Sequence, residues 1–383
     1  MQLERGDELS AGPAGIALLH IERARTGSGP WSTVQEWAAA MTRDPVVADP
    51  DTCGLYRGVP AVAFALHTAD QPVYADVLAV LDGHVATITW RRLIQAHERI
   101  DSGRLPELRE FDLVSGLTGI GVYLLHRYGG DDQLRGVLSY LVRLTEPLTV
   151  DGEALPGWWC GTAAGGELPQ RWPGGHGNLG LAHGIAGPLA LLATAMRRGT
   201  TVTGQAEAID RICGWLEQWH CGAGADPWWP GMISQSERRT GTVRQSGPQR
   251  PSWCYGTPGL ARAQQLAALA LDDPQRQRRA EEALARCVAG EQLSLLGDAS
   301  VCHGWAGLVL STWRAAADAG DGGKLADLLP RLQAGMEYHL RRHGPPARGG
   351  LLEGEAGVLL TQHTTAANAP PSSGWDACLL LNG

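Results

Sequence analysis

A pair of glycines separated by two residues recurs along the chain, and each pair introduces an apolar stretch rich in small residues. Each stretch is hydrophobic nearly all round, which is typical of a helix buried on most faces. Glycine at such positions lets the chain turn tightly and lets neighbouring backbones approach closely. The seven copies, of which the second is degenerate, have first glycines at Gly12, Gly58, Gly116, Gly184, Gly256, Gly304 and Gly354.

The segments between the glycine pairs are amphipathic. In residues 205–220 the apolar side chains recur at helical spacing, and Asp273-Pro274 predicts the start of another such helix. The stripe of the first helix is made by Ile209, Ile212, Leu216 and Trp219. Buried and amphipathic helices alternating seven times predict an all-α fold, an α/α toroid with seven inner and seven outer helices, in one domain over 1–383. A plain helical solenoid is the alternative, which we disfavour because a solenoid leaves its inner helices partly exposed.

Composition excludes several classes of protein. The 40 acidic and 32 basic residues give a net charge of -8, which argues against nucleic acid as the main partner. No apolar run approaches the roughly 18–20 residues of a membrane span. The first residues are acidic where a signal peptide is basic and then apolar. We therefore expect a cytoplasmic protein without a transmembrane segment, whose 8 cysteines are reduced rather than paired in a disulfide framework.

Chemically reactive side chains share a register with the glycine pairs. In a toroid every inner helix runs the same way, so all the glycine turns gather at one end. Cys254 and Cys302 each lie two residues before a first glycine, and His183 and His303 each lie one residue before. The set Cys254, Cys302 and His303 has the donors of a Cys₂His zinc site with an open fourth position, which is typical of catalytic zinc. In the alternative interpretation the cysteines are small buried apolar side chains and His303 is a core histidine.

The other cysteines lack this register. Cys213 and Cys287 fall within outer-helix patterns and are predicted to be core residues. Cys160 and Cys221 fall in loops, and their role stays open.

Three motifs carry a resemblance to a known family. They are His-Gly-Ile-Ala-Gly at 183–187, Trp-Cys-Tyr-Gly-Thr-Pro-Gly at 253–259 and Cys-His-Gly-Trp-Ala-Gly at 302–307. Together they resemble the motif set of the lanthipeptide cyclases, the LanC family, and the similarity continues through 352–357 and 375–381. The resemblance implies that Cys254, Cys302 and His303 hold one zinc ion.

The resemblance also implies an activity and its partners. The enzyme would form lanthionine and methyllanthionine rings of a lantibiotic-type peptide, by Michael addition of a peptide cysteine thiolate to dehydroalanine or dehydrobutyrine. The repeats occupy the chain, so we expect a stand-alone cyclase that receives a dehydrated precursor from a separate dehydratase and works alongside an exporter. Two alternatives remain: a LanC-like transferase that adds glutathione or another small thiol, and a zinc-bearing scaffold that binds peptides without catalysis.

Further residues are assigned roles on the same basis. His183 is the candidate proton donor, because an imidazole titrates near neutral pH, and Asp112 is the candidate base or the group that orients it. Arg250 is expected to hydrogen-bond the enolate oxygen, and Tyr255 to line the site or bond a ligand. The expected substrate-binding aromatic residues are Trp253 and Trp229. Each assignment has a structural alternative: a backbone-bound histidine, a helix-entry cap, an ion-paired arginine, and tryptophans that cap the core.

Overall fold

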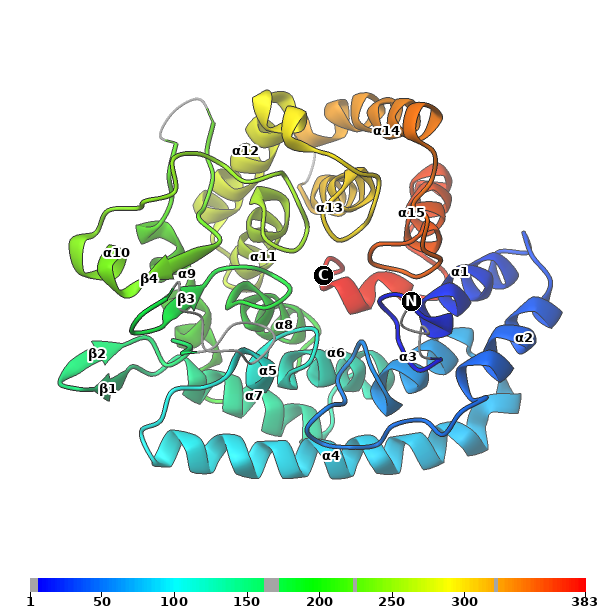
Figure 1. Cartoon of the computed structure of the whole chain (residues 1–383), viewed down its shortest axis with the longest axis horizontal. Helices are drawn as coiled ribbons and strands as arrows, with labels where there is room; N and C mark the ends of the chain where they lie inside the picture. Colours follow the sequence, from blue (N-terminus) through cyan, green and yellow to red (C-terminus); the bar gives the residue numbers. More distant parts are fainter. Residues whose placement is uncertain (1–5, 162–171, 223–225, 320–322) are drawn as a thin grey trace.

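Two concentric rings of helices dominate the computed structural model, which describes residues 6–383 apart from 162–171, 223–225 and 320–322 (Figure 1). The toroid predicted from the glycine repeat is confirmed. Within the described residues each of the seven glycine turns leads into one inner helix. These helices are α1 (Pro13–Arg25), α3 (Val59–Ala69), α6 (Leu117–Tyr128), α8 (Ala186–Arg197), α11 (Thr257–Ala270), α13 (Trp305–Asp318) and α15 (Glu355–Ala367).

Amphipathic helices form the outer ring. Asp273 caps α12 by accepting hydrogen bonds from the backbone N–H groups of Gln275 and Arg276, and a proline follows at the first helical position, as the sequence predicts. The outer helices of the described chain are α2 (Trp31–Met41), α4 (Ala75–Asp101), α7 (Asp132–Leu144), α9 (Gln205–Gln218), α12 (Pro274–Ala289) and α14 (Lys324–His343). Seven outer helices were predicted, but among the described residues there are six, because no outer helix follows α15. Two prolines at 370–371 interrupt helical hydrogen bonding, and the following apolar residues turn into the centre as the short 3₁₀ helix η3 (Trp375–Leu379).

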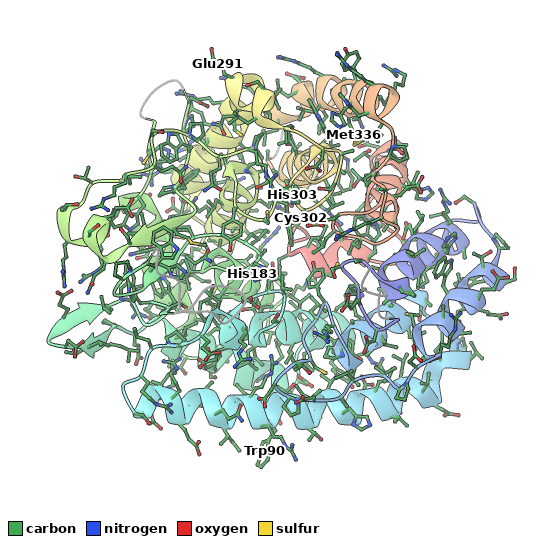
Figure 2. The ribbon with its side chains drawn as sticks, in the orientation of Figure 1. Trp90, His183, Glu291, Cys302, His303 and Met336 are labelled. Carbon is green, nitrogen blue, oxygen red and sulfur yellow. The ribbon has the colours of Figure 1, made fainter. Side chains whose placement is uncertain are left out.

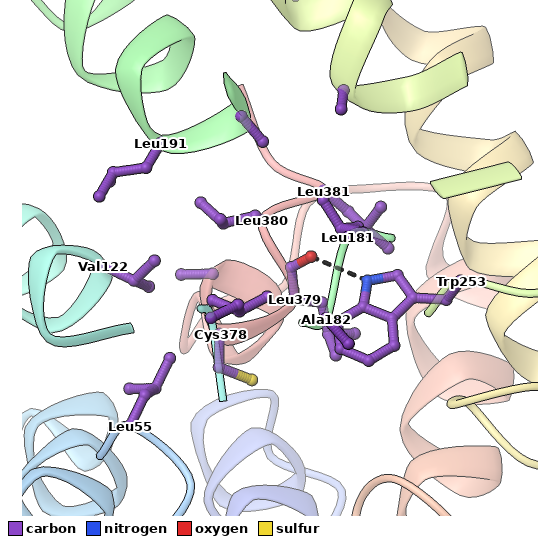
Figure 3. Close-up of a cluster of buried hydrophobic side chains, with 14 of the residues drawn as sticks. Leu55, Val122, Leu181, Ala182, Leu191, Trp253, Cys378, Leu379, Leu380 and Leu381 are labelled. Atoms are coloured by element: carbon purple, nitrogen blue, oxygen red, sulfur yellow. Dashed lines mark hydrogen bonds between the residues drawn. The ribbon is translucent and has the colours of Figure 1, made fainter. Parts of the chain in front are cut away.

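The C-terminal segment fills the middle of the ring. Leu379, Leu380 and Leu381 are all buried there (Figure 3). The indole Nε1 of Trp253 donates to the carbonyl oxygen of Leu379 at 2.9 Å, so an inner-helix turn is tied directly to this segment. The centre of the toroid is therefore apolar core rather than a channel.

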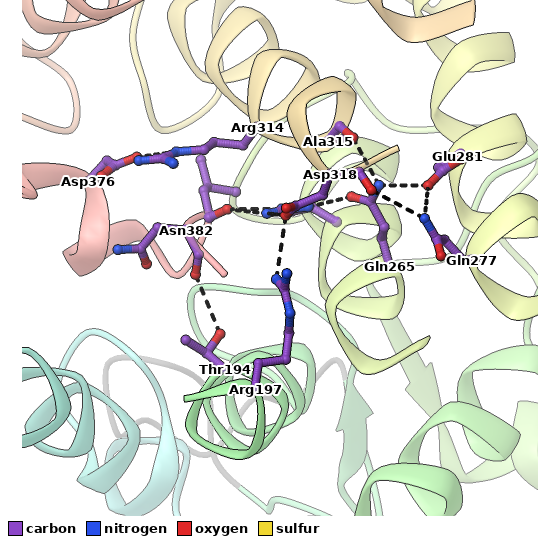
Figure 4. A network of polar contacts seen from close by, with 12 residues as sticks. Thr194, Arg197, Gln265, Gln277, Glu281, Arg314, Ala315, Asp318, Asp376 and Asn382 are labelled. Carbon is purple, nitrogen blue, oxygen red and sulfur yellow. Dashed lines mark hydrogen bonds and ion pairs between the residues drawn. The ribbon is translucent and has the colours of Figure 1, made fainter. Parts of the chain in front are cut away.

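Paired charges hold the same segment from the side. The guanidinium of Arg262 is buried, donates to the carbonyl oxygen of Leu381 at 2.9 Å and contacts Asp318 at 2.5 Å. Arg314 donates to the buried carboxylate of Asp376 at 2.6 Å in the same network (Figure 4). A buried charge without a partner costs several kcal/mol, so these contacts make the C-terminal segment an integral part of the fold.

Four short strands and several short helices lie in the loops between the helices of the two rings. Two antiparallel hairpins pair β1 with β2 and β3 with β4, the second with Gly177 opposite Ile233. The strands and remaining helices are β1 (Leu148–Val150), β2 (Glu153–Leu155), β3 (His176–Asn178), β4 (Met232–Ser234), α5 (Leu108–Phe111), α10 (Gln235–Thr240), η1 (Pro72–Tyr74) and η2 (Glu291–Leu295). None of the helices described here combines the length and the apolar character needed to cross a membrane.

Close backbone contact explains the second glycine of each pair. A Cβ atom built on Gly259 would lie 2.0 Å from the carbonyl oxygen of Trp253, and one on Gly307 would lie 1.9 Å from that of Val301. In every complete copy the contact is with the residue six positions earlier. The other glycines of this kind are Gly15, Gly119, Gly187 and Gly357. Only glycine leaves room for the preceding loop to fold back onto the helix start.

Backbone hydrogen bonds join the seven turns into a closed ring. The N–H of Cys254 donates to the carbonyl oxygen of Cys302 at 3.2 Å, and the N–H of Cys302 donates to that of Leu352 at 2.8 Å. The N–H of Leu352 then donates to the carbonyl oxygen of Ser10 at 2.9 Å, which joins the last turn to the first. The remaining links run from Leu9 to Tyr56, Tyr56 to Val114, Leu113 to Ala182, and Leu181 to Cys254. Each turn is thus held at a fixed spacing from the next.

Candidate metal and catalytic site

Two thiols and an imidazole converge where the fifth and sixth turns meet. The ligand atoms of Cys254, Cys302 and His303 all lie within 4.8 Å of one another. Figure 2 shows Cys302 and His303 near the centre of the ring, with His183 close to them in the view. The ring hydrogen bond between the two cysteines places adjacent turns side by side, and the non-helical turn before α13 directs both Cys302 and His303 to the same point.

The two thiols cannot ionise independently. A hydrogen bond from Cys302 lowers the pKa of Cys254 to about 5, and the same contact with Cys254 raises the pKa of Cys302. Without a cation, the pair therefore carries one negative charge rather than two. A tetrahedral zinc ion with bonds of about 2.0–2.3 Å has ligand atoms about 3.3–3.8 Å apart, a separation that falls within the 4.8 Å limit for these three atoms. The donor set and its shared charge fit a divalent soft cation.

The remaining cysteines are chemically different. Burial raises the pKa of each of them, and it raises that of Cys213 to about 12. The six are Cys53, Cys160, Cys213, Cys221, Cys287 and Cys378. The prediction that Cys213 and Cys287 belong to the core is confirmed, since both are buried.

A carboxylate orients the candidate histidine ligand. The Nε2 atom of His303 lies 3.3 Å from Oδ2 of Asp298, and the other carboxylate oxygen accepts the N–H of Ser300 at 2.8 Å. The hydrogen bond with Cys254 is the main cause that raises the pKa of His303; burial opposes it, and the Asp298 charge adds to it. Sequence analysis missed Asp298, although it lies six residues before a first glycine, the register of Arg250.

A second imidazole–carboxylate pair lies beside this set. The Nδ1 atom of His183 is 2.6 Å from Oδ2 of Asp112, which is almost fully buried. The other oxygen of Asp112 accepts the N–H groups of Ser115 at 2.6 Å and Gly116 at 2.8 Å. Asp112 thus fixes the turn that precedes α6 and is also the partner of His183. Burial opposes protonation of His183, but the hydrogen bond to Asp112 and nearby negative charges outweigh it and raise the pKa.

Tyr255 and Arg250 complete the surroundings. The hydroxyl of Tyr255 accepts a hydrogen bond from Nδ2 of Asn178 at 3.1 Å, and burial raises the pKa of Tyr255 to about 12. Its ring centroid lies 6.4 Å from that of His183, so a protonated phenol adjoins the imidazole. Arg250 is exposed, and within the described chain its side chain makes no hydrogen bond or ion pair. Its positive charge nevertheless acts on Cys302 and His303, where it partly opposes the rise in the pKa of each.

The two tryptophans predicted to bind substrate are placed elsewhere. Trp253 is fully buried against the C-terminal segment, and Trp229 donates its indole N–H to the carbonyl oxygen of Leu216 at 3.0 Å beneath α9. Trp253 occupies the position three residues before the first glycine, which is apolar and fully buried in all seven copies. Its counterparts are Leu9, Leu55, Leu113, Leu181, Val301 and Leu351. This placement makes Trp253 a packing residue, whereas Trp229 also lines a separate pocket of about 400 Å³, and its contact with substrate stays a prediction.

Open pockets adjoin the site on two sides. One, of about 470 Å³, includes His303 in its wall, and the other, of about 560 Å³, includes Tyr255. Asp298, His339, Arg348 and Glu353 also line the first pocket. Met232, Arg244, Gln245 and Gln249 also line the second. Two of the site residues, His303 and Tyr255, therefore each border an open pocket.

Comparison with known proteins agrees with this architecture. The family model described as lanthionine synthetase C-like protein matches residues 4–380. Nisin biosynthesis protein NisC of Lactococcus lactis subsp. lactis is 24% identical over 318 residues, covering 81% of this chain and 73% of that protein. The solved structure of nisin cyclase matches with a TM-score of 0.80 and 23% identity, over 99% of this chain and 93% of that one. Since the family match spans nearly the whole sequence, the chain belongs to the lanthionine synthetase C-like family.

Proposed function

We propose that this protein is a zinc-dependent, stand-alone lanthipeptide cyclase that closes thioether rings within a dehydrated peptide. The observation that carries the proposal is the convergence of Cys254, Cys302 and His303 within 4.8 Å, beside the hydrogen-bonded pair of His183 and Asp112. The relative named as a nisin biosynthesis protein supports the choice of substrate class. The pockets on both sides of the site support a peptide rather than a compact small molecule.

Cys254, Cys302 and His303 are the residues that would hold zinc. When bound, zinc supplies a positive charge that deprotonates a substrate cysteine and holds it as a thiolate. Asp298 accepts a hydrogen bond from Nε2 of His303. This contact leaves Nδ1 as the imidazole nitrogen that turns toward the cysteines.

Proton delivery falls to His183. In the proposed reaction the substrate thiolate forms a bond to the β-carbon of dehydroalanine or dehydrobutyrine, and the electron pair of the C=C bond moves onto the α-carbon as an enolate. Since Nδ1 of His183 is engaged by Asp112, Nε2 is the nitrogen that gives its proton to the α-carbon. The proton lost by the substrate thiol balances the one delivered, so ring closure leaves the peptide mass unchanged.

Arg250 and Tyr255 stabilise the negative charge that develops on the enolate. The enolate oxygen is anionic, and Tyr255 is a protonated phenol that can donate to it. Arg250 contributes a positive charge near the cysteines from an exposed position, where it can turn toward a bound peptide. The N-termini of the inner helices meet at this end of the toroid and favour the same charge.

The test uses the purified full-length chain with a synthetic peptide that contains one dehydroalanine and one cysteine. We expect about one zinc per chain by elemental analysis, following a Cys₂His set. We also expect loss of the free thiol at unchanged peptide mass, and uptake of one deuterium per ring in D₂O. Added glutathione that increases the peptide mass would instead indicate a small-thiol transferase, and an unchanged thiol count would indicate a binding scaffold.

Three variants separate the roles. Cys302→Ala should lose both zinc and ring formation, whereas His183→Gln should retain zinc and lose ring formation. Cys213→Ala is the matched control, because this cysteine lies in the core of α9, and it should retain both. Ring closure by Cys302→Ala at the wild-type rate would refute the proposed mechanism.

The proposed activity also implies an order of reactions, in which dehydration of the precursor comes before ring closure. Its proposed substrate carries dehydrated serine or threonine, so a separate dehydratase must act first on a ribosomal precursor. We propose that the cyclase meets this precursor in the cytoplasm and that an exporter receives the cyclised product.

A further inference from the structure

The outward side of α4 carries an apolar stripe that no described residue covers. Eight large apolar side chains are exposed in this part of the chain, and five of them lie on α4 or the turn before it. They are Val73, Val77, Val80, Trp90 and Ile94, with exposed fractions of 73%, 36%, 62%, 64% and 38%. Figure 1 shows α4 along one edge of the molecule, and Figure 2 shows Trp90 pointing away from it. Single exposed apolar residues are ordinary, but five on one helix and its entry, in two groups on either side of Gly83 and His84, mark a candidate interaction surface.

The stripe is symmetric about its own midpoint. Two antiparallel helices related by a two-fold axis bring together residues that lie equally far on either side of the axis. The mirrored pairs, centred between Gly83 and His84, are Val73 with Ile94, Val77 with Trp90, and Val80 with Thr87. Successive members of these pairs are separated by four, three, seven, three and four residues, and steps of three, four and seven keep side chains on one side of a helix. The surface is therefore complementary to itself.

The charges beside the stripe follow the same symmetry. Asp76 and Arg91 lie equally far on either side of the same midpoint. Both are exposed, and within the described residues neither side chain makes a hydrogen bond or ion pair. An antiparallel pairing places Asp76 opposite Arg91 of the partner subunit twice, once on each side of the axis. At the midpoint a Cβ atom on Gly83 would meet nothing within 4 Å, so the helices can approach closely there.

We propose that two copies of this chain associate through α4, antiparallel across a two-fold axis between Gly83 and His84. The stripe from Val73 to Ile94 is about 31 Å long at 1.5 Å per residue. With a width of about 10 Å it contributes about 300 Å² from each copy, which is below a standard-size interface of about 1,200–2,000 Å² in total. The dimer is therefore weak and forms in a concentration-dependent way. The turns with the metal site lie toward the ring centre, so both copies keep an open site.

Sedimentation velocity of the full-length, reduced chain over a range of concentrations tests this pairing. We expect the sedimentation coefficient to rise from the monomer to the dimer value as concentration increases. Trp90→Glu should weaken dimerisation at least about tenfold, because the substitution enters the interface twice. Tyr338→Glu is the matched control, since this aromatic residue is 57% exposed on α14, and it should leave dimerisation unchanged. A chain that stays monomeric at every concentration overturns the proposal, whether or not another protein binds α4.

Charge reversal tests the orientation. Asp76→Arg and Arg91→Asp should each weaken the dimer, because like charges then face each other twice. Mixing the two single variants should restore association as a heterodimer, since each reversed charge then meets an opposite one. The double variant should restore the homodimer in the same way. A dimer that tolerates both single reversals, or that mixing does not rescue, overturns the antiparallel arrangement. Ring-forming activity provides a fold check for all variants, because none of these residues lies in the proposed site.

Discussion

Replacing Asp112 with asparagine tests the buried contact that we assign to proton transfer. The amide keeps an oxygen that can accept from the N–H groups of Ser115 and Gly116, but it removes the negative charge that faces His183 at 2.6 Å. A hydrogen bond to a charged group contributes about 1.5–3 kcal/mol, and about 1.4 kcal/mol corresponds to one pH unit. The pKa of His183 should therefore fall. It should drop below its ordinary value, because burial then dominates.

The same substitution predicts the pH dependence of stability. The folded-state pKa of His183 lies above its unfolded value, so protonated His183 stabilises the folded protein. This contribution is fully present below the unfolded pKa of about 6.5 and disappears as the pH rises through the folded pKa. The unfolding free energies of wild type and Asp112→Asn should therefore differ by about 1.5–3 kcal/mol near pH 5.5 and converge in alkaline solution.

Histidine-selective NMR and urea unfolding measure the two effects. The His183 signal is assigned by its loss in His183→Gln and then followed against pH in both proteins. Asp101→Asn serves as the control, since this carboxylate is 66% exposed and pairs with Arg143 at the far end of α4. Identical titration of His183 in wild type and Asp112→Asn would refute the assigned role of the carboxylate.

Four further predictions concern the candidate metal site, two glycines and the reactivity of the cysteines. Asp298→Asn should weaken zinc binding by about 10–100-fold in competition with a chromogenic chelator, and unchanged affinity would contradict its orienting role. Gly259→Ala should lower the free energy of unfolding by about 1–3 kcal/mol, because the new methyl group would overlap a carbonyl oxygen. Gly214→Ala, with open space around it in α9, should instead raise the free energy of unfolding by about 0.5–1 kcal/mol, and urea denaturation distinguishes the signs. In metal-free protein at neutral pH, iodoacetamide should modify Cys254 before buried Cys287, and equal rates by mass spectrometry would disprove the assigned pKa order.

The glycine repeat predicted the fold because it is a backbone constraint. Each second glycine is required by contact with a loop carbonyl, and that contact is the same in every complete copy. The register that follows from it also located Cys254 and Cys302, since both occupy the position that links adjacent turns. The glycine register alone therefore predicts at which end of the toroid the candidate site lies.

Side-chain direction within a turn was harder to predict. Trp253 is next to Cys254, yet its side chain enters the core because its register position is buried in every copy. Asp298 reaches His303 across a bend that spacing alone does not describe. The C-terminal leucines fill the centre through contacts with helices distant in sequence, which no local pattern encodes.

The ring of hydrogen bonds has a consequence for how such a centre can arise. In every link the accepting carbonyl belongs to the residue two positions before a first glycine, so the spacing of the two cysteine positions is a property of the scaffold rather than of one site. Each of the seven adjacent pairs of turns has the same two residue positions side by side, and in this protein one pair carries cysteine at both. Duplication of a single turn-and-helix unit would supply all seven pairs of positions before any of them carried a metal ligand. A few substitutions at one such pair would then be enough to create a metal centre without altering the fold.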